Sequence, residues 1–410
     1  MLYRLFFGVL PALLSFNALF SKRINHFLSG RMNLFPSLKR FRNEKPGKLV
    51  WFHVASLGEY EQAKPVIAKW KEVFPDYLVA VSFFSPSGYE PTSKKPQPHV
   101  DLITYLPLDR KSWADKFVNL LNPEFAFFVK YDLWYHHIQA LKRRKIPVYL
   151  ISAVFRPSQI YFSLYGDFFK NLLFQLDWIF TQNIQSLALL ETIGISKASK
   201  VGDTRFDRVA ATAADPKPME DIQSWIGEKP AVVIGSAWQE DMDLLIPLIN
   251  SKPEYRWIIA PHDLSPEPMD RWAAQLTSPS QKYSLWSSKG DNAILFIDNI
   301  GMLSSLYQFG KIAYVGGGSG KGLHNILEPI GFGIPVIFAK VKNAGKFPEA
   351  GQSQLEGCGF EVSSTEDLVR VFESLEDSDF YKTSADSAKK WVNLNLGAAD
   401  RIVSFIHSQI

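Results

Sequence analysis

The sequence predicts an α/β protein built from two Rossmann-like, doubly wound domains that face a central cleft. The first observation behind this prediction is that short β-rich runs alternate with longer helical runs from residue 48 onward. This alternation is typical of parallel sheets with crossover helices. The second is that the chain has 410 residues, of which 46% are hydrophobic, so it can bury more than one large core.

The expected strands form two series, separated by a run of small residues, prolines and charges. The first series covers residues 48–54, 77–83, 102–105, 125–129, 148–151 and 178–181. The second covers residues 231–235, 256–260, 293–297, 312–315 and 335–338, and a terminal helix is expected from about residue 384 to 410. The predicted segments are an N-terminal helix with a basic flank (1–45), a first domain (46–210), a linker (211–230), a second domain (231–385) and a C-terminal helix (386–410).

The charge balance and the cysteine content exclude several classes of protein. There are 45 Lys and Arg against 41 Asp and Glu, so the net charge of +4 is too small for a dedicated nucleic-acid binder or a disordered chain. The single cysteine, Cys358, cannot form an internal disulfide, which favours working parts that face the cytoplasm. No cluster of Cys and His predicts a zinc site.

The opening of the chain predicts contact with a membrane. Residues 1–20 are apolar apart from Tyr3, Arg4, Ser15 and Asn17. No small-residue cleavage site follows, and the next residues are rich in Lys and Arg, so we do not expect a cleaved secretory signal. We expect an uncleaved segment that either spans the bilayer or lies in its interface, with the basic flank on the cytoplasmic side. The alternative is a buried N-terminal helix in a soluble domain.

A carboxylate stands where the first strand turns into a helix. The run VWFHVASLGEYEQAKPV at residues 50–66 leads from a strand through a small-residue turn to a helix that opens with Glu59. A carboxylate in this position can accept a proton from a sugar hydroxyl. Equally, an acid in the first turn of a helix stabilises the helix by up to about 1 kcal/mol. The local pattern leaves both interpretations open, and His53 is expected to be a strand residue packed beneath the site.

A glycine cluster in the second half predicts a phosphate-binding turn. The run VGGGSGKGLHNILE at residues 315–328 follows a strand and leads into a helix that is expected to begin near His324. Glycines allow the backbone to approach a ligand, and a helix start offers unpaired N–H donors. The spacing fits neither a Walker loop nor a dinucleotide fingerprint. A purely structural glycine turn is the alternative.

Two further segments end strands of the second half. In the run SAWQEDMD at residues 236–243, Ser236 is a candidate phosphate contact, whereas the acids are explained by helix capping and the helix dipole and not by a metal site. His262 follows another strand and is a candidate contact for a nucleotide, although a lone histidine is more often structural.

Ordered motifs along most of the chain resemble those of the Kdo transferases of lipopolysaccharide assembly, a family with the two-domain GT-B fold. The family's H-x-x-S-x-G-E resembles HVASLGE at residues 53–59, its T-P-T-G resembles SPSG at 85–88, and its Y-x-P-x-D resembles YLPLD at 105–109. Its G-N-x-K-F-D is similar to GDTRFD at 202–207, with Arg205 in place of the lysine. Its P-R is similar to PH at 261–262, its D-T-x-G to DNIG at 298–301, and its H-N-x-x-E-P to HNILEP at 324–329. The last of these, behind the glycine run, is the most specific.

The resemblance implies roles for particular residues. Glu59 would be the general base, with Asp132 and Arg205 as further catalytic groups. The residues implied to bind the donor are Ser236, Pro261, His262, Ile300, Gly301, Met302, Gly317, Gly318, Asn325, Ile326, Leu327 and Glu328.

The resemblance also implies an activity. The expected reaction is an inverting transfer of Kdo from CMP-Kdo to a lipid A precursor of the lipid IVA type, without a cofactor or a metal ion, at the cytoplasmic face of the inner membrane. The expected partners are CMP-Kdo, the lipid A precursor and an anionic membrane surface, with no nucleic acid. Basic residues such as Arg23, Arg31 and Arg40 would engage the acidic head of the lipid.

Departures from the motifs keep other interpretations open. The family's E-T-E-L-W-P-N becomes KYDLWYH at residues 130–136, so that Lys130 replaces the first acid and Asp132 the second. His262 stands in place of an arginine, and Met302 in place of an acid. One alternative is a sugar-nucleotide 2-epimerase of GT-B-like fold, and another is a non-catalytic relative at the membrane surface.

Overall fold

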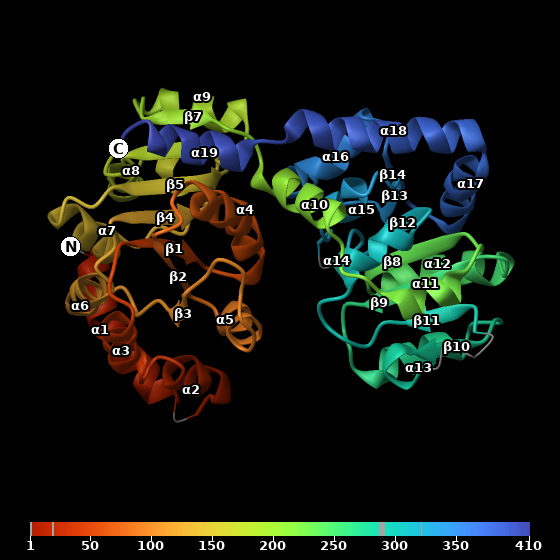
Figure 1. Cartoon of the computed structure of the whole chain (residues 1–410), viewed down its shortest axis with the longest axis horizontal. Helices are drawn as coiled ribbons and strands as arrows, with labels where there is room; N and C mark the ends of the chain where they lie inside the picture. Colours follow the sequence, from red (N-terminus) through yellow and green to blue (C-terminus); the bar gives the residue numbers. More distant parts are fainter. Residues whose placement is uncertain (1, 19, 287–291, 321) are drawn as a thin grey trace. The chain divides into compact units, whose positions relative to one another are not determined.

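The computed structural model describes residues 2–18, 20–286, 292–320 and 322–410. The chain folds into two compact units, which are described separately (Figure 1). Unit 1 comprises Met1–Arg208 and Gly397–Ile410, and unit 2 comprises Val209–Leu396. Each unit contains one seven-stranded sheet whose neighbouring strands are all parallel, which confirms the predicted pair of doubly wound α/β domains.

The sheet of unit 1 has the strand order β3-β2-β1-β4-β5-β6-β7. Its strands are β1 (Leu49–Val54), β2 (Leu78–Phe83), β3 (Leu102–Tyr105), β4 (Phe125–Val129), β5 (Val148–Ala153), β6 (Trp178–Thr181) and β7 (Ala198–Lys200). The order reverses direction between β1 and β4. In sheets of this kind, ligands bind outside the carboxyl ends of the strands at this switch point.

Helices cover both faces of this sheet. The helices of this unit are α1 (Leu2–Ala18), α2 (Lys22–Ser29), α3 (Leu34–Glu44), α4 (Leu57–Val73), α5 (Pro86–Ser93), α6 (Lys111–Leu121), α7 (Tyr135–Arg143), α8 (Asp167–Leu173), α9 (Ile184–Thr192) and α19 (Ala398–His407). Alternate residues of β1 point to opposite faces: Trp51 packs with α6 and α7, whereas Val50 and Phe52 pack with α4 and α19. Every residue of β1 is buried, which explains why its sequence is apolar at every position except His53.

The sheet of unit 2 has the order β10-β11-β9-β8-β12-β13-β14, with its switch point between β8 and β12. Its strands are β8 (Ala231–Ala237), β9 (Arg256–Pro261), β10 (Ser280–Lys282), β11 (Ile294–Phe296), β12 (Ile312–Val315), β13 (Val336–Ala339) and β14 (Gly359–Val362). Its helices include α11 (Glu220–Ile226), α12 (Gln239–Ser251), α13 (Pro266–Ala273), α14 (Leu303–Leu306), α15 (Leu327–Gly331), α16 (Pro348–Leu355), α17 (Thr365–Glu376) and α18 (Ser378–Asn395). The core on one face of this sheet is formed with α12, α13 and α17.

Two expected segments end differently in the structure. The predicted C-terminal helix 386–410 is divided into α18 and α19 at Gly397, whose φ of 88° interrupts the helix. The carboxylate of Asp207 accepts hydrogen bonds from the N–H groups of Gly397 (2.6 Å) and Ala399 (2.8 Å), and α19 thereby belongs to unit 1. The predicted linker 211–230 holds the end of α10 (Thr204–Ala214) and all of α11.

The N-terminal helices pack onto unit 1 and do not form a separate segment. Leu34 and Leu38 of α3 are buried in its core, and the hydroxyl of Tyr3 donates to Asp109 at 2.6 Å. In the part of the chain that the structure describes, none of the helices combines the length and apolar character that crossing a membrane requires.

Arg31 is wrongly predicted as a contact for a lipid head. Its guanidinium donates to the backbone carbonyls of Phe27, Phe84 and Leu106 and lies 4.4 Å from the centre of the Tyr105 ring. Burial lowers the pKa of Arg31 to about 10. The donors of Arg31 therefore anchor the end of α2 to the loops after β2 and β3.

Candidate active site

Glu59 lies in the first turn of α4, directly after β1 at the switch point of unit 1. Its Oε2 accepts a hydrogen bond from the N–H of Ala55 at 2.5 Å, so Glu59 stabilises the start of the helix, as one interpretation of the sequence predicted. The side chain is 8% exposed, and burial raises its pKa above the ordinary value. The negative charge of Asp132 raises this pKa further, while the Ala55 N–H and the charge of Lys130 oppose the rise. A carboxylate with a raised pKa is a stronger base, so the geometry also suits proton transfer.

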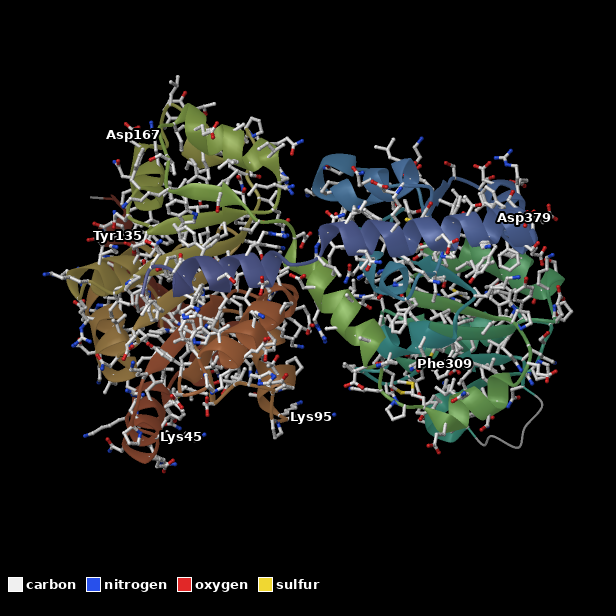
Figure 2. The ribbon with its side chains drawn as sticks, turned by 45° about the horizontal axis from the view of Figure 1, so that its top comes forward. Lys45, Lys95, Tyr135, Asp167, Phe309 and Asp379 are labelled. Carbon is white, nitrogen blue, oxygen red and sulfur yellow. The ribbon has the colours of Figure 1, made fainter. Side chains whose placement is uncertain are left out.

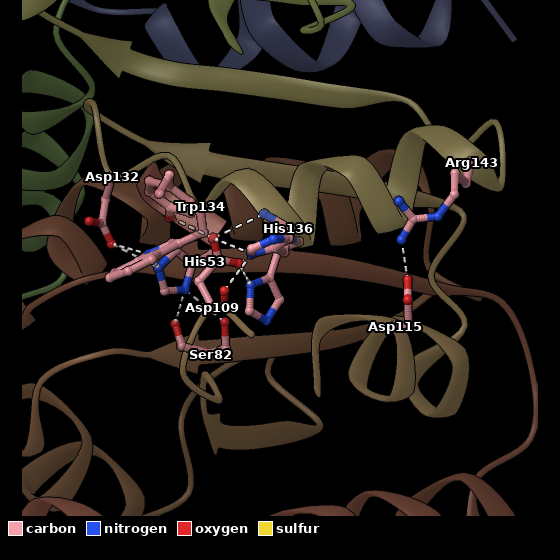
Figure 3. Close-up of polar contacts among 10 residues, drawn as sticks. His53, Ser82, Asp109, Asp115, Asp132, Trp134, His136 and Arg143 are labelled. Carbon is pink, nitrogen blue, oxygen red and sulfur yellow. Dashed lines mark hydrogen bonds and ion pairs between the residues drawn. The ribbon is translucent and has the colours of Figure 1, made fainter. Parts of the chain in front are cut away.

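Asp132 follows β4, the neighbour of β1, and is held by two side chains (Figure 3). His53 Nε2 lies 2.8 Å from Asp132 Oδ2, and the indole N–H of Trp134 donates to the same oxygen at 3.0 Å. On the other side of the ring, His53 Nδ1 lies 2.9 Å from the hydroxyl of Ser82. His53 is fully buried beneath the site, where the sequence placed it, and it fixes the orientation of the partly exposed Asp132.

A second carboxylate, that of Asp109, fixes the start of α7, the helix that follows Asp132 and Trp134. Asp109, fully buried in the loop after β3, accepts hydrogen bonds from the N–H groups of His136 (2.9 Å) and His137 (3.1 Å) at the start of α7. It also accepts from the ring of His137 at 2.7 Å and from Tyr3. Burial acts to raise the pKa of Asp109, but these hydrogen bonds outweigh it and hold the pKa well below its usual range. Asp109 is therefore a buried anion that caps α7 from another loop.

Arg205, predicted to stabilise charge, lies in the first turn of α10 and is paired with an acid. Its Nε and Nη2 lie 2.9 Å and 2.8 Å from Asp203 Oδ2, and its backbone N–H donates to Asp203 Oδ1. Part of its charge is thus neutralised within unit 1.

The glycine turn of unit 2 follows β12 and is packed tightly against its neighbours. A side chain at Gly317 would meet the carbonyl oxygen of Gly322 at 2.4 Å, and one at Gly318 would meet that of Ala339 at 2.1 Å. The N–H of Gly317, expected to face a phosphate, donates instead to the buried carboxylate of Asp241 at 3.0 Å. The glycines are therefore required by the packing of the loop itself, which is the structural alternative that the sequence left open.

Asp241 links this turn to the end of β8. Besides Gly317, it accepts hydrogen bonds from the N–H of Trp238 at the start of α12 (3.0 Å) and from the hydroxyl of Tyr314 (2.9 Å). Burial raises its pKa, and these hydrogen bonds oppose the rise. The predicted capping role is confirmed for Asp241. Among the described residues, no group of His, Cys, Asp and Glu is arranged to hold a metal ion. Ser236, the predicted phosphate contact, has a φ of 54° at an irregularity between β8 and β9.

The helix expected near His324 begins three residues later, at Leu327, and α15 is only five residues long. The side chain of Asn325 occupies the turn before it: Oδ1 accepts from the N–H of Leu327 (3.3 Å) and Nδ2 donates to Glu328 (3.2 Å). Ile326 and Leu327, two of the predicted donor contacts, are fully buried, so neither residue is exposed to a ligand in this structure.

A stacked aromatic group at the carboxyl edge of the second sheet was not predicted as a group. Trp238 after β8 stacks on His262 after β9, with ring centres 4.2 Å apart, and His262 lies 4.7 Å from His324 after β12. The indole N–H of Trp238 also donates to Nε2 of His324 at 3.2 Å. Burial lowers the pKa of His324 to about 4 and lowers that of His262, so both rings are neutral near pH 7. The signal available in the sequence was that all three residues follow strands of one parallel sheet.

The predicted contacts 300–302 lie in the loop after β11, at the same edge of this sheet. Ile300 is 81% exposed, Gly301 has a φ of 95°, and Met302 is the residue before α14. Pro261, another predicted contact, is the last residue of β9 and precedes His262.

Two doubly wound parallel domains, each with polar residues at its switch point, define a protein of the GT-B-type fold. Solved structures agree with this class. The UDP-GlcNAc 2-epimerase from Neisseria meningitidis bound to UDP-GlcNAc is 17% identical, with a TM-score of 0.64 over 88% of this chain and 100% of that one. A UDP-N-acetylglucosamine 2-epimerase from Listeria monocytogenes, described as putative in its source, is 14% identical, with a TM-score of 0.62 over 88% and 96%. At these identities the likeness shows the fold alone.

Sequence comparisons give the family. Residues 28–208 match the family described as 3-deoxy-D-manno-octulosonic-acid transferase (kdotransferase). The 3-deoxy-D-manno-octulosonic acid transferase of Aquifex aeolicus is 27% identical over 349 residues, which cover 82% of this chain and 89% of the relative. That of Chlamydia trachomatis is 27% identical over 317 residues, covering 73% of each chain. The chain is thus similar over most of its length to the Kdo transferases, the family that its motifs resemble.

Proposed function

We propose that the chain is an inverting glycosyltransferase that moves Kdo from CMP-Kdo to a lipid A precursor of the lipid IVA type. The observation that carries this proposal is the carboxylate of Glu59 at the switch point of unit 1, with a pKa raised by burial. Similarity to the Kdo transferases supports the nature of the donor. The sequence relatives that carry the transferase name do not favour the epimerase alternative.

In the proposed reaction, Glu59 accepts the proton of the acceptor hydroxyl. The acceptor oxygen forms a bond to the anomeric carbon of Kdo, and the bond from that carbon to the phosphate oxygen of CMP breaks, so that cytidylate leaves with the electron pair. Cytidylate is a weakly basic leaving group, and no metal or cofactor is required. His53 and Trp134 orient Asp132. The negative charge of Asp132 raises the pKa of Glu59 and so strengthens Glu59 as a base. We retain Arg205 as a candidate for stabilising the developing charge.

We assign the donor to unit 2. The neutral stack of Trp238, His262 and His324 offers a face for the cytosine ring, and Asn325 and Glu328 offer polar atoms for the ribose and phosphate. The complete set proposed from the family motifs is Ser236, Pro261, His262, Ile300, Gly301, Met302, Gly317, Gly318, Asn325, Ile326, Leu327 and Glu328.

Replacement of Trp238 by alanine tests this assignment. We expect the Kd for CMP, measured by calorimetry, to rise about 5- to 150-fold, since stacking of a base on an aromatic ring contributes roughly 1–3 kcal/mol. Phe380→Ala, which removes a partly exposed ring on α18 of the same unit, is the matched control and should leave CMP binding unchanged. Equal CMP binding by Trp238→Ala and wild type would remove the stack from the site.

We also propose that α1 rests in the interface of an anionic membrane at the cytoplasmic face. Phe6, Val9, Leu13 and Phe16 are between 47% and 64% exposed at helical spacing. The exposed Lys22 and Arg23 follow α1 and add attraction for anionic lipids. The double variant Leu13→Ser/Phe16→Ser should reduce cosedimentation with phosphatidylglycerol vesicles by at least about tenfold, given roughly 1.5–3 kcal/mol for each buried side chain.

The matched control for this variant changes two exposed leucines of unit 2, Leu355→Ser/Leu394→Ser. An equal loss of vesicle binding in both variants would contradict the role of α1.

Mass spectrometry of the lipid product tests the function directly. After incubation of the full chain with CMP-Kdo and a tetraacyl lipid A precursor, we expect the precursor to gain the mass of Kdo, with release of CMP that depends on the acceptor. Conversion of UDP-GlcNAc to an epimer in a parallel incubation, with no lipid product, would establish the epimerase instead. Absence of both reactions would favour the non-catalytic alternative.

A further inference from the structure

A cavity of about 440 Å³ lies in unit 1 beside the candidate active site. Its wall includes Gly8 of α1, Arg110 and Lys111 at the start of α6, and Tyr135, His136 and Arg143 of α7. Tyr135 directly follows Trp134, the residue whose indole donates to Asp132. Tyr135 and His136 belong to the segment 130–136 that departs from the family motif, whereas Gly8, Arg110, Lys111 and Arg143 lie in none of the motifs that the resemblance used.

The charged side chains of this wall are positive. Arg110 and Lys111 are exposed and have no ion-pair partner among the residues that the structure describes. Arg143 is paired with Asp115. The nearest acid in sequence, Asp109, is fully buried and its carboxylate is committed to α7 and Tyr3, so it does not neutralise the cavity.

His136 contributes a buried polar group to the same wall. The side chain is only 5% exposed, and its Nδ1 donates to the backbone carbonyl of Asp109 at 2.5 Å. Because Nδ1 is the donor, Nε2 of the neutral ring is an acceptor; it has no partner in the described part of the chain and is left to accept a hydrogen bond from a ligand hydroxyl. The first N–H groups of α6, an 11-residue helix, are also uncapped by a side chain. Cationic side chains and unpaired N–H groups together are the chemistry that binds phosphate.

We propose that this cavity binds the phosphate monoester of a lipid headgroup. The lipid, and not a free phosphate, is favoured because α1 supplies both Gly8 to the wall and the exposed apolar side chains of Phe6 and Val9 nearby on the same helix. An amphiphile can place its phosphate in the cavity and its acyl chains along α1. The inference rests on the proposed function only in that the acceptor is taken to be a lipid with an acidic head, which the cavity would hold close to Asp132.

Binding of the full chain to vesicles tests the proposal without any donor, so its outcome is independent of transfer activity. Two kinds of phosphatidylcholine vesicle would be compared. One contains phosphatidic acid, a phosphate monoester, and the other contains phosphatidylglycerol, a diester, in the amount that gives the same total charge. We expect the wild type to prefer phosphatidic acid, and Arg110→Ala/Lys111→Ala to weaken that binding by about tenfold or more while binding to phosphatidylglycerol changes little. The matched control is Lys94→Ala/Lys95→Ala, which removes two adjacent exposed cations from the same unit; Lys95 projects from the surface in Figure 2.

Three results would overturn the proposal. The first is an equal loss of phosphatidic acid binding in the two double variants, which would reduce the effect to bulk charge. The second is the absence of a preference for the monoester lipid in the wild type. The third is binding of inorganic phosphate as tight as that of short-chain phosphatidic acid, which would make a free anion the ligand. An unfolding midpoint temperature equal to that of the wild type, measured for both double variants, establishes that the comparison concerns folded protein.

Discussion

Replacement of Glu59 by glutamine is expected to lower the kcat for Kdo transfer by about 10²- to 10⁴-fold, while the KM for CMP-Kdo stays unchanged. Glutamine keeps an oxygen that can accept the hydrogen bond from the N–H of Ala55, so the start of α4 is preserved. It cannot accept the proton of the acceptor hydroxyl. Steady-state kinetics of CMP release, with a fixed concentration of lipid acceptor, measure the effect.

Two controls separate the base from the helix cap. Glu72→Gln removes an exposed acid from the same helix and should leave kcat unchanged. Glu59→Ala removes both functions, so it should lose activity and also have a free energy of unfolding lower than that of Glu59→Gln, by the roughly 0.5–2 kcal/mol typical of a lost cap. Transfer at the wild-type rate by Glu59→Gln would exclude this residue as the base.

The pH dependence of transfer has a defined sign. Burial raises the pKa of Glu59, and only the ionised carboxylate can accept a proton. Accordingly, kcat/KM has its full value above the raised pKa and falls as the pH drops through that pKa. This fall should occur at a higher pH than it would for a glutamate with an ordinary pKa. In Glu59→Gln, the residual activity should lack this acidic limb.

Replacement of Asp109 by alanine is expected to destabilise unit 1 by about 3–5 kcal/mol, the range for removing one partner of a buried, hydrogen-bonded charge network. The change leaves the N–H groups of His136 and His137 and the hydroxyl of Tyr3 without their acceptor. Because the chain has two units, hydrogen exchange of the α7 amides is a better measure than a single unfolding curve. We expect these amides to lose most of their protection.

Asp115→Ala is the matched control for Asp109→Ala, because it removes a partly exposed acid of α6 and should cost no more than about 1 kcal/mol. The folded-state pKa of Asp109 is lowered, so its stabilising effect is present above the unfolded-state pKa and is lost as the pH falls through that value toward the lowered one. Protection of α7 should therefore decrease in acid in the wild type but not in Asp109→Ala. Unchanged protection in the variant at neutral pH would show that α7 does not depend on this carboxylate.

The sequence was most informative where a local pattern reflects burial on both sides. The central strands of both sheets are continuous apolar runs because each is covered by helices on two faces, and all of them were predicted. The strands that were missed are β7, β10 and β14, and each of them is an edge strand of its sheet. Two of them have only three residues, ASK and SQK, and the third is partly exposed, so they carry no apolar signature.

At the candidate site, the sequence identified single residues but not their partners. Glu59 and Asp132 were named from motifs, whereas the hydrogen bond between Asp132 and His53 joins residues 79 positions apart. The stack of Trp238, His262 and His324 and the capping of α7 by Asp109 likewise join separate loops. No local spacing predicts such contacts, because they depend on which strands become neighbours.

By itself, the sequence determined the fold class, the resemblance to the Kdo transferases and the position of an acid after the first strand, since these follow from hydrophobic periodicity and from short motifs. Only the tertiary structure decided that the N–H of Gly317 is used by Asp241, that Arg31 is a structural residue, and that α19 packs on unit 1. The reason is physical. A buried polar group takes whichever partner the packing of distant segments brings within hydrogen-bond distance, and this choice leaves no trace in the residues beside it.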